Sequence, residues 1–255
     1  MEQNKTGKYV KYAIGEIILV VIGILIALQI NNWNNNRIDS KREANYILNI
    51  ERDLYNQIEA IDIQIAFESK IADYTKSALA PYRETNNLIM DSTLAKAIGT
   101  INSRRTFLNP NPTYTELISS GNIELIKNES LKTELINYYQ ETERIELIMA
   151  NNNTLFTDQQ FSPIMMRFGI SSSEEDWENM FNSYQNKYSS GNPLSPKNML
   201  RLSQISTRLL QDEANELLFV NHLSEREGYA INHIFLLTEL KVRTNKILKS
   251  IKTKI

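Results

Sequence analysis

"GEIILVVIGILIALQINNW", from Gly15 to Trp33, is the stretch that decides the architecture of this 255-residue chain. It is apolar enough to leave water, yet it carries one carboxylate, Glu16, near its start. With its flanks, from Tyr12 to Ile30, the segment is about 28 Å long as a helix, close to the roughly 30 Å of a bilayer's hydrocarbon core. This length and composition predict a helix that spans a membrane.

A cleaved export signal and a buried core helix are the alternatives to a membrane span. A cleaved signal needs small residues in an A-x-A-like arrangement after its apolar core, and "ALQIN" at 27–31 fits that pattern poorly. The alternative of a buried helix in a soluble domain remains, because the strictly apolar residues run only from Ile17 to Leu28, a length that also fits such a helix. We predict an uncleaved signal-anchor helix over residues 12–33. Its expected interfacial anchors are Tyr9, Tyr12 and Trp33.

Basic residues before the span indicate its orientation. Three lysines precede it and only Glu2 offsets them, so residues 1–11 are expected to be a cytoplasmic tail. Residues 34–255 are then a domain outside the cytoplasm. Basic residues also follow the span, which reduces the charge difference between its two sides. The lysines of the tail are Lys5, Lys8 and Lys11.

The carboxylate in the span has two interpretations. Glu16 lies about one turn inside the expected cytoplasmic interface, where it can reach headgroups and nearby lysines. Alternatively, helical spacing places it on one face with Gly23 and Ala27, and Gly23-x-x-x-Ala27 is a small-xxx-small pattern that lets membrane helices approach closely. A polar residue on such a face can bond a neighbouring span. Glu16, Gly23 and Ala27 are therefore a candidate transmembrane interface.

Two stretches of the chain resemble a known family. "YAIGEIILVVIGILIALQINNWN", from Tyr12 to Asn34, resembles the N-terminus of a large family of single-pass bacterial proteins of unknown function. "TYTELISSGNIELIKNESLKTELINYY", from Thr113 to Tyr139, resembles that family's shared helix–Ser-Gly–helix region. The resemblance implies a bacterial inner-membrane protein with a helical domain, and it carries over no catalytic residue.

Composition and periodicity predict an all-α domain of long antiparallel helices. The chain has 8 glycines and 6 prolines, too few for a turn-rich β sandwich. A first helix over 38–80 carries an apolar stripe of helical period, and the asparagines at 31–36 leave open whether a hinge precedes it. The stripe consists of Ile47, Ile50, Leu54, Ile58, Ile61 and Ile65.

Capping signals place the other helices. Asp91 or Ser92 begins a short one, Thr113-x-x-Glu116 has the spacing of a capping box, and Gly121 suits a helix end. A longer helix is expected from Glu129 to Phe161, capped by Asn128 or Ser130 and ended before Pro163. Another begins at Ser172 or Ser173 and buries Trp177, Phe181 and Tyr184. Ser195 and Pro196 then start one last helix of about 55 residues that continues to about Ser250.

The end of the last helix is basic. From position 241 onward it has six basic residues and no acidic one, together with an apolar stripe. Such an end can contact anionic headgroups, or it can be a solvated helix whose cations favour the helix dipole and whose stripe serves the bundle core. The candidate membrane-facing residues are Lys241, Arg243, Lys246, Lys249, Lys252 and Lys254.

No pattern typical of an active site occurs in the sequence. HExxH, the phosphate-binding loops GxGxxG and GxxxxGK[ST], and GxSxG are all absent, and so is cysteine. The two histidines, His222 and His233, lack the Glu-x-x-His spacing of di-iron bundles. We therefore expect bonded or exposed helical histidines, with no catalytic residue, metal or cofactor.

We interpret the chain as a membrane-anchored scaffold that is not an enzyme and assembles through its span. Its expected partners are the lipid bilayer and either further copies of itself or another membrane protein. The formal net charge of -2 gives no case for binding nucleic acid. The alternative is a helical-bundle domain that senses a ligand or binds a partner and signals through another protein, because the tail is too short for an output domain. A sensor predicts a pocket in the bundle, whereas an enzyme requires clustered titratable residues.

Overall fold

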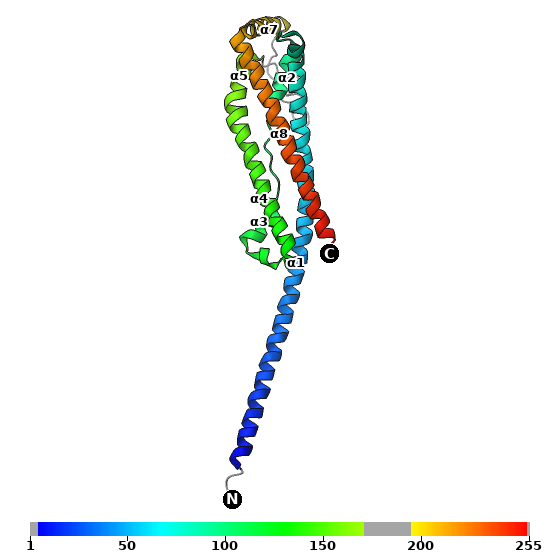
Figure 1. Cartoon of the computed structure of the whole chain (residues 1–255), viewed down its shortest axis with the longest axis vertical. Coiled ribbons are helices and arrows are strands. Elements are labelled where there is room, and N and C mark those ends of the chain that lie inside the picture. Colours follow the sequence, from blue (N-terminus) through cyan, green and yellow to red (C-terminus); the bar gives the residue numbers. More distant parts are fainter. Residues whose placement is uncertain (1–4, 171–194, 254–255) are drawn as a thin grey trace. The chain divides into compact units, whose positions relative to one another are not determined.

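A computed structural model describes residues 5–170 and 195–253, with the side chains from residue 13 onward (Figure 1). Every regular element in these ranges is a helix, so the all-α prediction is confirmed. The predicted helix with Trp177, Phe181 and Tyr184 lies outside the described residues. The elements are α1 (Lys5–Thr85), α2 (Ser92–Ile101), α3 (Pro112–Ser119), the 3₁₀ helix η1 (Asn122–Leu125), α4 (Glu129–Asn151), the π-helix η2 (Asn152–Phe161), α5 (Ser162–Phe168), α7 (Pro196–Leu210) and α8 (Glu213–Lys252).

The chain divides into two compact units. Unit 1 comprises Met1–Asp53 and Pro112–Thr133, and unit 2 comprises Leu54–Asn111 and Glu134–Ile255. In unit 1, α1 continues without interruption through the asparagines at 31–36, so no hinge separates the apolar stretch from the helix that follows.

Polar contacts fix the short elements of unit 1 on α1. The Tyr46 hydroxyl donates to Glu116 Oε1 at 2.9 Å and accepts from Asn122 Nδ2 at 2.9 Å. The backbone N–H of Lys127 donates to Glu43 Oε1 at 2.7 Å. Three apolar side chains of the same unit are buried, at Ile50, Leu117 and Ile126.

Most predicted helix ends are confirmed, and the capping box is wrong. Helix α3 begins at Pro112, two residues before the start at Tyr114 that the box implies, and the Thr113 N–H donates to Asp53 Oδ2 at 3.1 Å. A buried carboxylate from α1 therefore satisfies the N–H group that we expected a local cap to serve. The confirmed signals are Asp91, Asn128 and Ser195 as N-terminal caps and Gly121, with φ of 71°, at a helix end.

Unit 2 is built on three long helical stretches, namely α1 from Leu54 onward, α4 and α8 (Figure 1). Helix α8 runs antiparallel to α1, because Lys252 bonds the Tyr55 hydroxyl at 2.6 Å while Glu227 pairs with Arg83 at 3.3 Å. It also runs antiparallel to α4. The apolar stripe near its end lies in the core, through Leu237, Leu240, Leu248 and Ile251.

Two predicted helices of unit 2 are corrected. The last helix is not continuous, because Asp212 interrupts it and its side chain accepts from the Asn215 N–H at 3.1 Å, which starts α8. Gly228 lies inside α8 without breaking it. The helix predicted to end before Pro163 instead widens to a π-helix and continues as α5. Phe161 keeps helical φ and ψ at this junction, so α5 begins at Ser162 without a break and Pro163 lies in its first turn.

Candidate functional site

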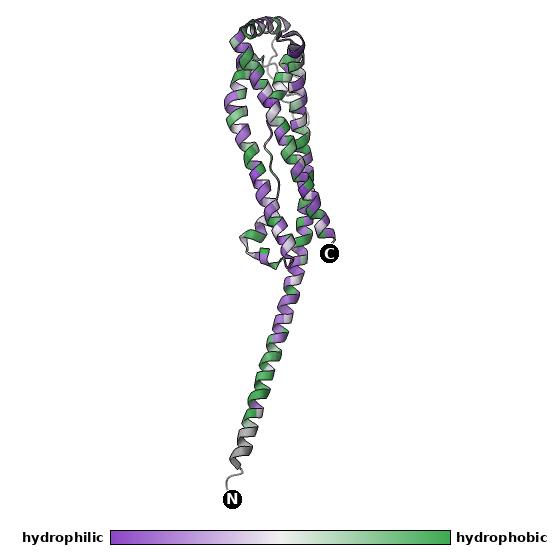
Figure 2. Cartoon of the chain, in the orientation of Figure 1, coloured by the Kyte–Doolittle hydropathy of each residue, from purple (hydrophilic) through white to green (hydrophobic). Residues whose placement is uncertain are grey.

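The predicted span is an exposed apolar stretch of α1. Its 18-residue window has a mean hydropathy of 2.6, and none of it is buried in the described structure. Figure 2 shows it as a mostly hydrophobic band along the lower part of the helix. The stretch is therefore not a core helix of the described chain. It is long and apolar enough to cross a membrane.

The predicted interface residues lie in this stretch with no contact from the rest of the described chain. Glu16, Gly23 and Ala27 are all exposed, and a Cβ atom added at Gly23 would meet nothing within 4 Å. Trp33 is also exposed, and the Arg37 guanidinium lies 5.8 Å from its ring centroid. Tyr9 and Tyr12 lie on the same helix. The structure places these residues without testing their roles.

The basic end of α8 takes part in contacts within unit 2. Lys241 pairs with Asp62 at 2.6 Å, and Lys252 bonds the Tyr55 hydroxyl with its ammonium 5.4 Å from the ring centroid. Arg243 and Lys246 lie 3.9 and 3.8 Å from carboxylates of α4. Lys249 is exposed, and Lys254 lies outside the described residues. Contact of this end with headgroups stays a prediction.

The two histidines have separate surroundings. His222 is half-buried, with Nδ1 2.8 Å from the Leu218 carbonyl oxygen of its own helix. His233 is 1% exposed, and its Nε2 lies 3.0 Å from the amide nitrogen of Asn152. Among the described residues, no group of three or more histidine, aspartate or glutamate side chains is arranged to hold a metal ion.

Sequence reasoning missed a buried polar cluster in unit 2. We call Gln64, Glu68, Arg226 and His233 the Glu68 cluster; each is 1% exposed. Glu68 Oε1 accepts from Gln64 Nε2 at 3.1 Å and lies 3.2 Å from His233 Nδ1, although the latter contact lacks the alignment of a hydrogen bond. Glu68 Oε2 lies 3.9 Å from Arg226 Nη1. A carboxylate, Glu68, and a guanidinium, Arg226, are therefore buried away from water.

An irregular segment explains part of this burial. Residues 103–111, which we call the strap, form no helix, so their backbone groups need partners from outside a regular element. Arg226 donates to the carbonyl oxygens of Ile101 and Ser103, at 3.3 and 3.1 Å. Gln64 and Asn153 both donate to the Arg105 carbonyl, at 3.4 and 3.2 Å.

The far end of the strap is held in the same way. Gln57 Nε2 donates to the Pro110 carbonyl at 2.6 Å, and the Asn109 N–H donates to Glu146 Oε1 at 2.5 Å. The Tyr138 hydroxyl lies 2.8 Å from Gln57 Oε1 and 2.9 Å from Thr244 Oγ1. Burial raises the pKa of the Tyr138 phenol and also that of the Glu146 carboxyl. The strap thus joins α1, α4 and α8 through side chains.

A signal for these residues was present in the sequence. The buried positions of α1 repeat with alternating steps of three and four residues, as in helix packing of coiled-coil type. Gln57, Gln64 and Glu68 continue that series, while Ile58 and Ile65, which we assigned to the stripe, are only half-buried. The series reads Ile50, Leu54, Gln57, Ile61, Gln64, Glu68, Ile71 and Thr75. Following the spacing rather than the apolar character would have found the polar members.

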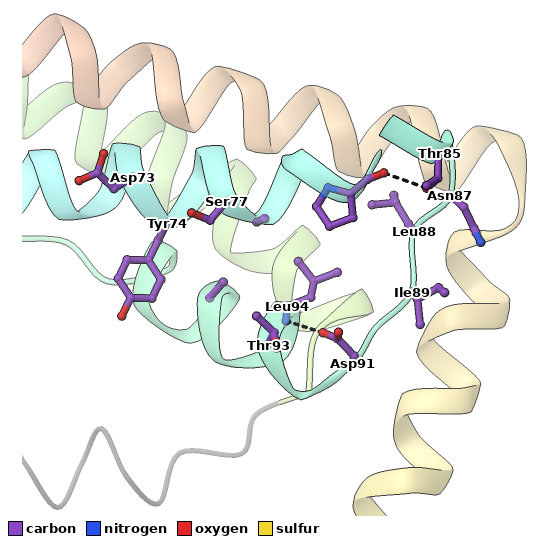
Figure 3. Close-up of a pocket in the computed structure, with 13 residues that line it drawn as sticks. Asp73, Tyr74, Ser77, Thr85, Asn87, Leu88, Ile89, Asp91, Thr93 and Leu94 are labelled. Atoms are coloured by element: carbon purple, nitrogen blue, oxygen red, sulfur yellow. Dashed lines mark hydrogen bonds between the residues drawn. The ribbon is translucent and has the colours of Figure 1, made fainter. Parts of the chain in front are cut away.

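Unit 2 also has a cavity of about 470 Å³ between the end of α1 and the start of α2 (Figure 3). Its walls include the apolar side chains of Leu88, Ile89 and Leu94 and the carboxylates Asp73 and Asp91, and none of the described residues that line it is basic. Asp91 Oδ1 already accepts from the Leu94 N–H at 2.8 Å. The cavity has room for a small, mostly apolar molecule.

These features define an all-α protein with one helix near its N-terminus that is long and apolar enough to cross a membrane. Residues 16–203 match the model of a family of unknown function (DUF6090), and the chain belongs to this family. Neither a search of curated proteins nor one of solved structures gives a match. The predicted membership of an uncharacterised family is thus confirmed, while the opening motif that we assigned to it stays a prediction.

Proposed function

We propose that the protein is a membrane-anchored scaffold without enzymatic activity, which assembles with other membrane helices through the anchor part of α1. One observation carries the proposal: none of the apolar window is buried within the described chain. A continuous apolar surface of this length needs lipid or another protein to cover it. The apolar residues of the helix can be covered by lipid, and its face of small residues can be covered by a helix of another protein chain.

The pairing surface is the face of Glu16, Gly23 and Ala27. The open space at Gly23 means that a partner backbone can approach there without first displacing part of this chain. Glu16 supplies a polar group at the shallow end of the same face. The partner is either a second copy of the chain or a different membrane protein.

We further propose that the anchor lies in a bacterial inner membrane with the N-terminus in the cytoplasm. The three lysines of the tail support this orientation through the preference of basic residues for the cytoplasmic side. A cysteine placed on α8 should then react with a thiol reagent that cannot cross the inner membrane. Protection of that cysteine in cells with an intact inner membrane would reverse the orientation.

The absence of an enzymatic role is supported by the burial of the titratable residues that the fold brings together. Glu68, Arg226 and His233 are each 1% exposed, so a substrate has no access to them in this conformation. Within residues 5–170 and 195–253, no histidine, lysine or arginine lines the more accessible cavity.

The test is the mass of the full-length chain in mild detergent, for the wild type and the double variant Glu16→Leu/Gly23→Leu. We expect a defined oligomer or complex for the wild type and a monomer for the variant. Gly15→Leu is the matched control, since Gly15 also has nothing within 4 Å but lies off the face. A monomeric wild type without a co-purifying partner, or equal loss of assembly in the control, contradicts the proposal.

A further inference from the structure

We propose that the cavity between the end of α1 and the start of α2 binds a small organic cation, namely a primary ammonium that carries a short hydrocarbon group. Its volume of about 470 Å³ falls within the range of about 300–1,000 Å³ that is usual for small-molecule sites. Such sites are mostly apolar and hold a few polar groups that fix the orientation of the ligand. The cavity has both features, and the scaffold role proposed above makes no use of it.

The wall of the cavity is preformed. Its loop part, residues 86–91, is bonded at its start, where the Asn86 N–H donates to the Tyr82 carbonyl oxygen at 2.8 Å. Near its end the Met90 N–H donates to Thr207 Oγ1 of α7 at 3.0 Å. A loop that is fixed in this way keeps its shape, so binding has little backbone left to order.

Apolar side chains form a large part of the wall. Ile89 lies between two buried residues of the loop, Leu88 and Met90, but is itself 57% exposed where it lines the cavity (Figure 3). Leu94 and Ala97 of α2 add to the same wall. A hydrocarbon group that enters the cavity covers this apolar surface and displaces water from it, which is favourable.

The charged groups of the wall select the sign of the ligand. They are two carboxylates, Asp73 and Asp91, and every other described residue that lines the cavity is uncharged. Asp91 Oδ1 accepts from the Leu94 N–H at 2.8 Å, which leaves Oδ2 for a ligand. The ammonium of Lys70 already lies 5.7 Å from the ring centroid of Tyr74, which also lines the cavity. The site therefore attracts cations and repels carboxylates, and its apolar wall strengthens both effects relative to water.

The probe that tests the proposal is 2-phenylethylammonium, compared with two molecules of similar shape, neutral 2-phenylethanol and anionic 3-phenylpropanoate. Binding to the full chain in mild detergent is measured by ligand-observed NMR titration, with the detergent alone as the blank. We expect a dissociation constant below about 1 mM for the ammonium. The alcohol should bind about tenfold more weakly, and the carboxylate should not bind.

Two variants with matched controls assign the binding to this cavity. Asp91→Asn removes the charge and keeps a good N-terminal cap, so it should weaken ammonium binding about tenfold and leave that of the alcohol unchanged. Asp212→Asn, at the cap of α8, is its control and should bind like the wild type. Ser77→Leu places a larger side chain in the cavity and should abolish binding of both molecules. Ser224→Leu, at an exposed serine of α8, should not.

Four results overturn the proposal. These are a wild type that does not bind the ammonium, equal binding of the three probes, an Asp91→Asn variant that behaves like Asp212→Asn, and unchanged binding in Ser77→Leu. Circular dichroism establishes that each variant is folded. If Asp91→Asn is not, the comparison of the three probes on the wild type and on Ser77→Leu decides.

Discussion

One helix, α1, holds two regions that reverse the usual distribution of polar and apolar residues. From Ile14 to Ile30 it exposes its large apolar side chains, whereas from Gln57 to Glu68 it buries amide and carboxylate groups. The first region lacks a partner for its apolar surface within the described chain. The second has partners for most of its polar atoms, because the strap supplies backbone carbonyls and α8 supplies Arg226 and His233. The comparison shows that residue character along a helix reflects what covers each part of it.

The largest effect is expected from charging the anchor. Ile22→Arg/Ile26→Arg places two guanidinium groups near the middle of the span. Each raises the free energy of membrane insertion by about 2.5–3.5 kcal/mol. In a Ser224→Cys background, which adds a single thiol on α8 to a cysteine-free chain, we expect labelling from outside the inner membrane to be lost. The measurement is the labelled fraction in cells whose inner membrane is intact.

The control for that variant is Leu217→Arg/Ile231→Arg, at two exposed apolar positions of α8. It should be labelled like the parent chain. If both double variants behave alike, the apolar stretch is not treated differently from any other exposed apolar surface, and the anchor interpretation loses its basis.

The next effect concerns the buried region. Arg226→Met removes the guanidinium from beside Glu68 and leaves two carbonyls without donors, so we expect a loss of about 3–5 kcal/mol in the free energy of unfolding. Arg201→Met, at an exposed arginine of α7, should stay within about 0.5 kcal/mol. Denaturant titration followed by circular dichroism measures both. Equal, small losses would mean that the buried charge of Glu68 is compensated in some other way.

The smallest effect is a change in pH dependence at Glu146. Because burial raises the pKa of this carboxyl in the folded chain, ionisation disfavours folding, and stability decreases as pH rises from the ordinary carboxyl value through the raised one. Glu146→Gln removes that decrease and keeps an oxygen that can accept from the Asn109 N–H. Denaturation midpoints over this acid range measure the difference from the wild type.

The exposed Glu239 gives the control, since Glu239→Gln should leave the wild-type profile unchanged. A Glu146→Gln profile that follows the wild type would show that the carboxylate is solvated in the folded protein. In that case the hold on the strap at Asn109 is looser than the structure indicates.

The sequence by itself determined the features that depend on neighbours along the chain. A continuous apolar run of sufficient length identified the candidate span. Ser195 was identified as a cap, and Asp91 and Asn128 each as one of two candidates, because a short polar side chain bonds an N–H group three residues later. These are local interactions, so their spacing is visible in the sequence.

The tertiary structure alone decided the features that join distant positions. Asp53 replaces a local cap at Thr113 because α1 brings a carboxylate to that N–H. Glu68 meets Arg226 and His233 only because α8 runs antiparallel to α1. Gln64 and Arg226 are buried because an irregular strap lies between the helices and its carbonyl oxygens need donors. No periodicity reports such a need, since it arises from an irregular backbone segment that meets these helices only in the folded chain.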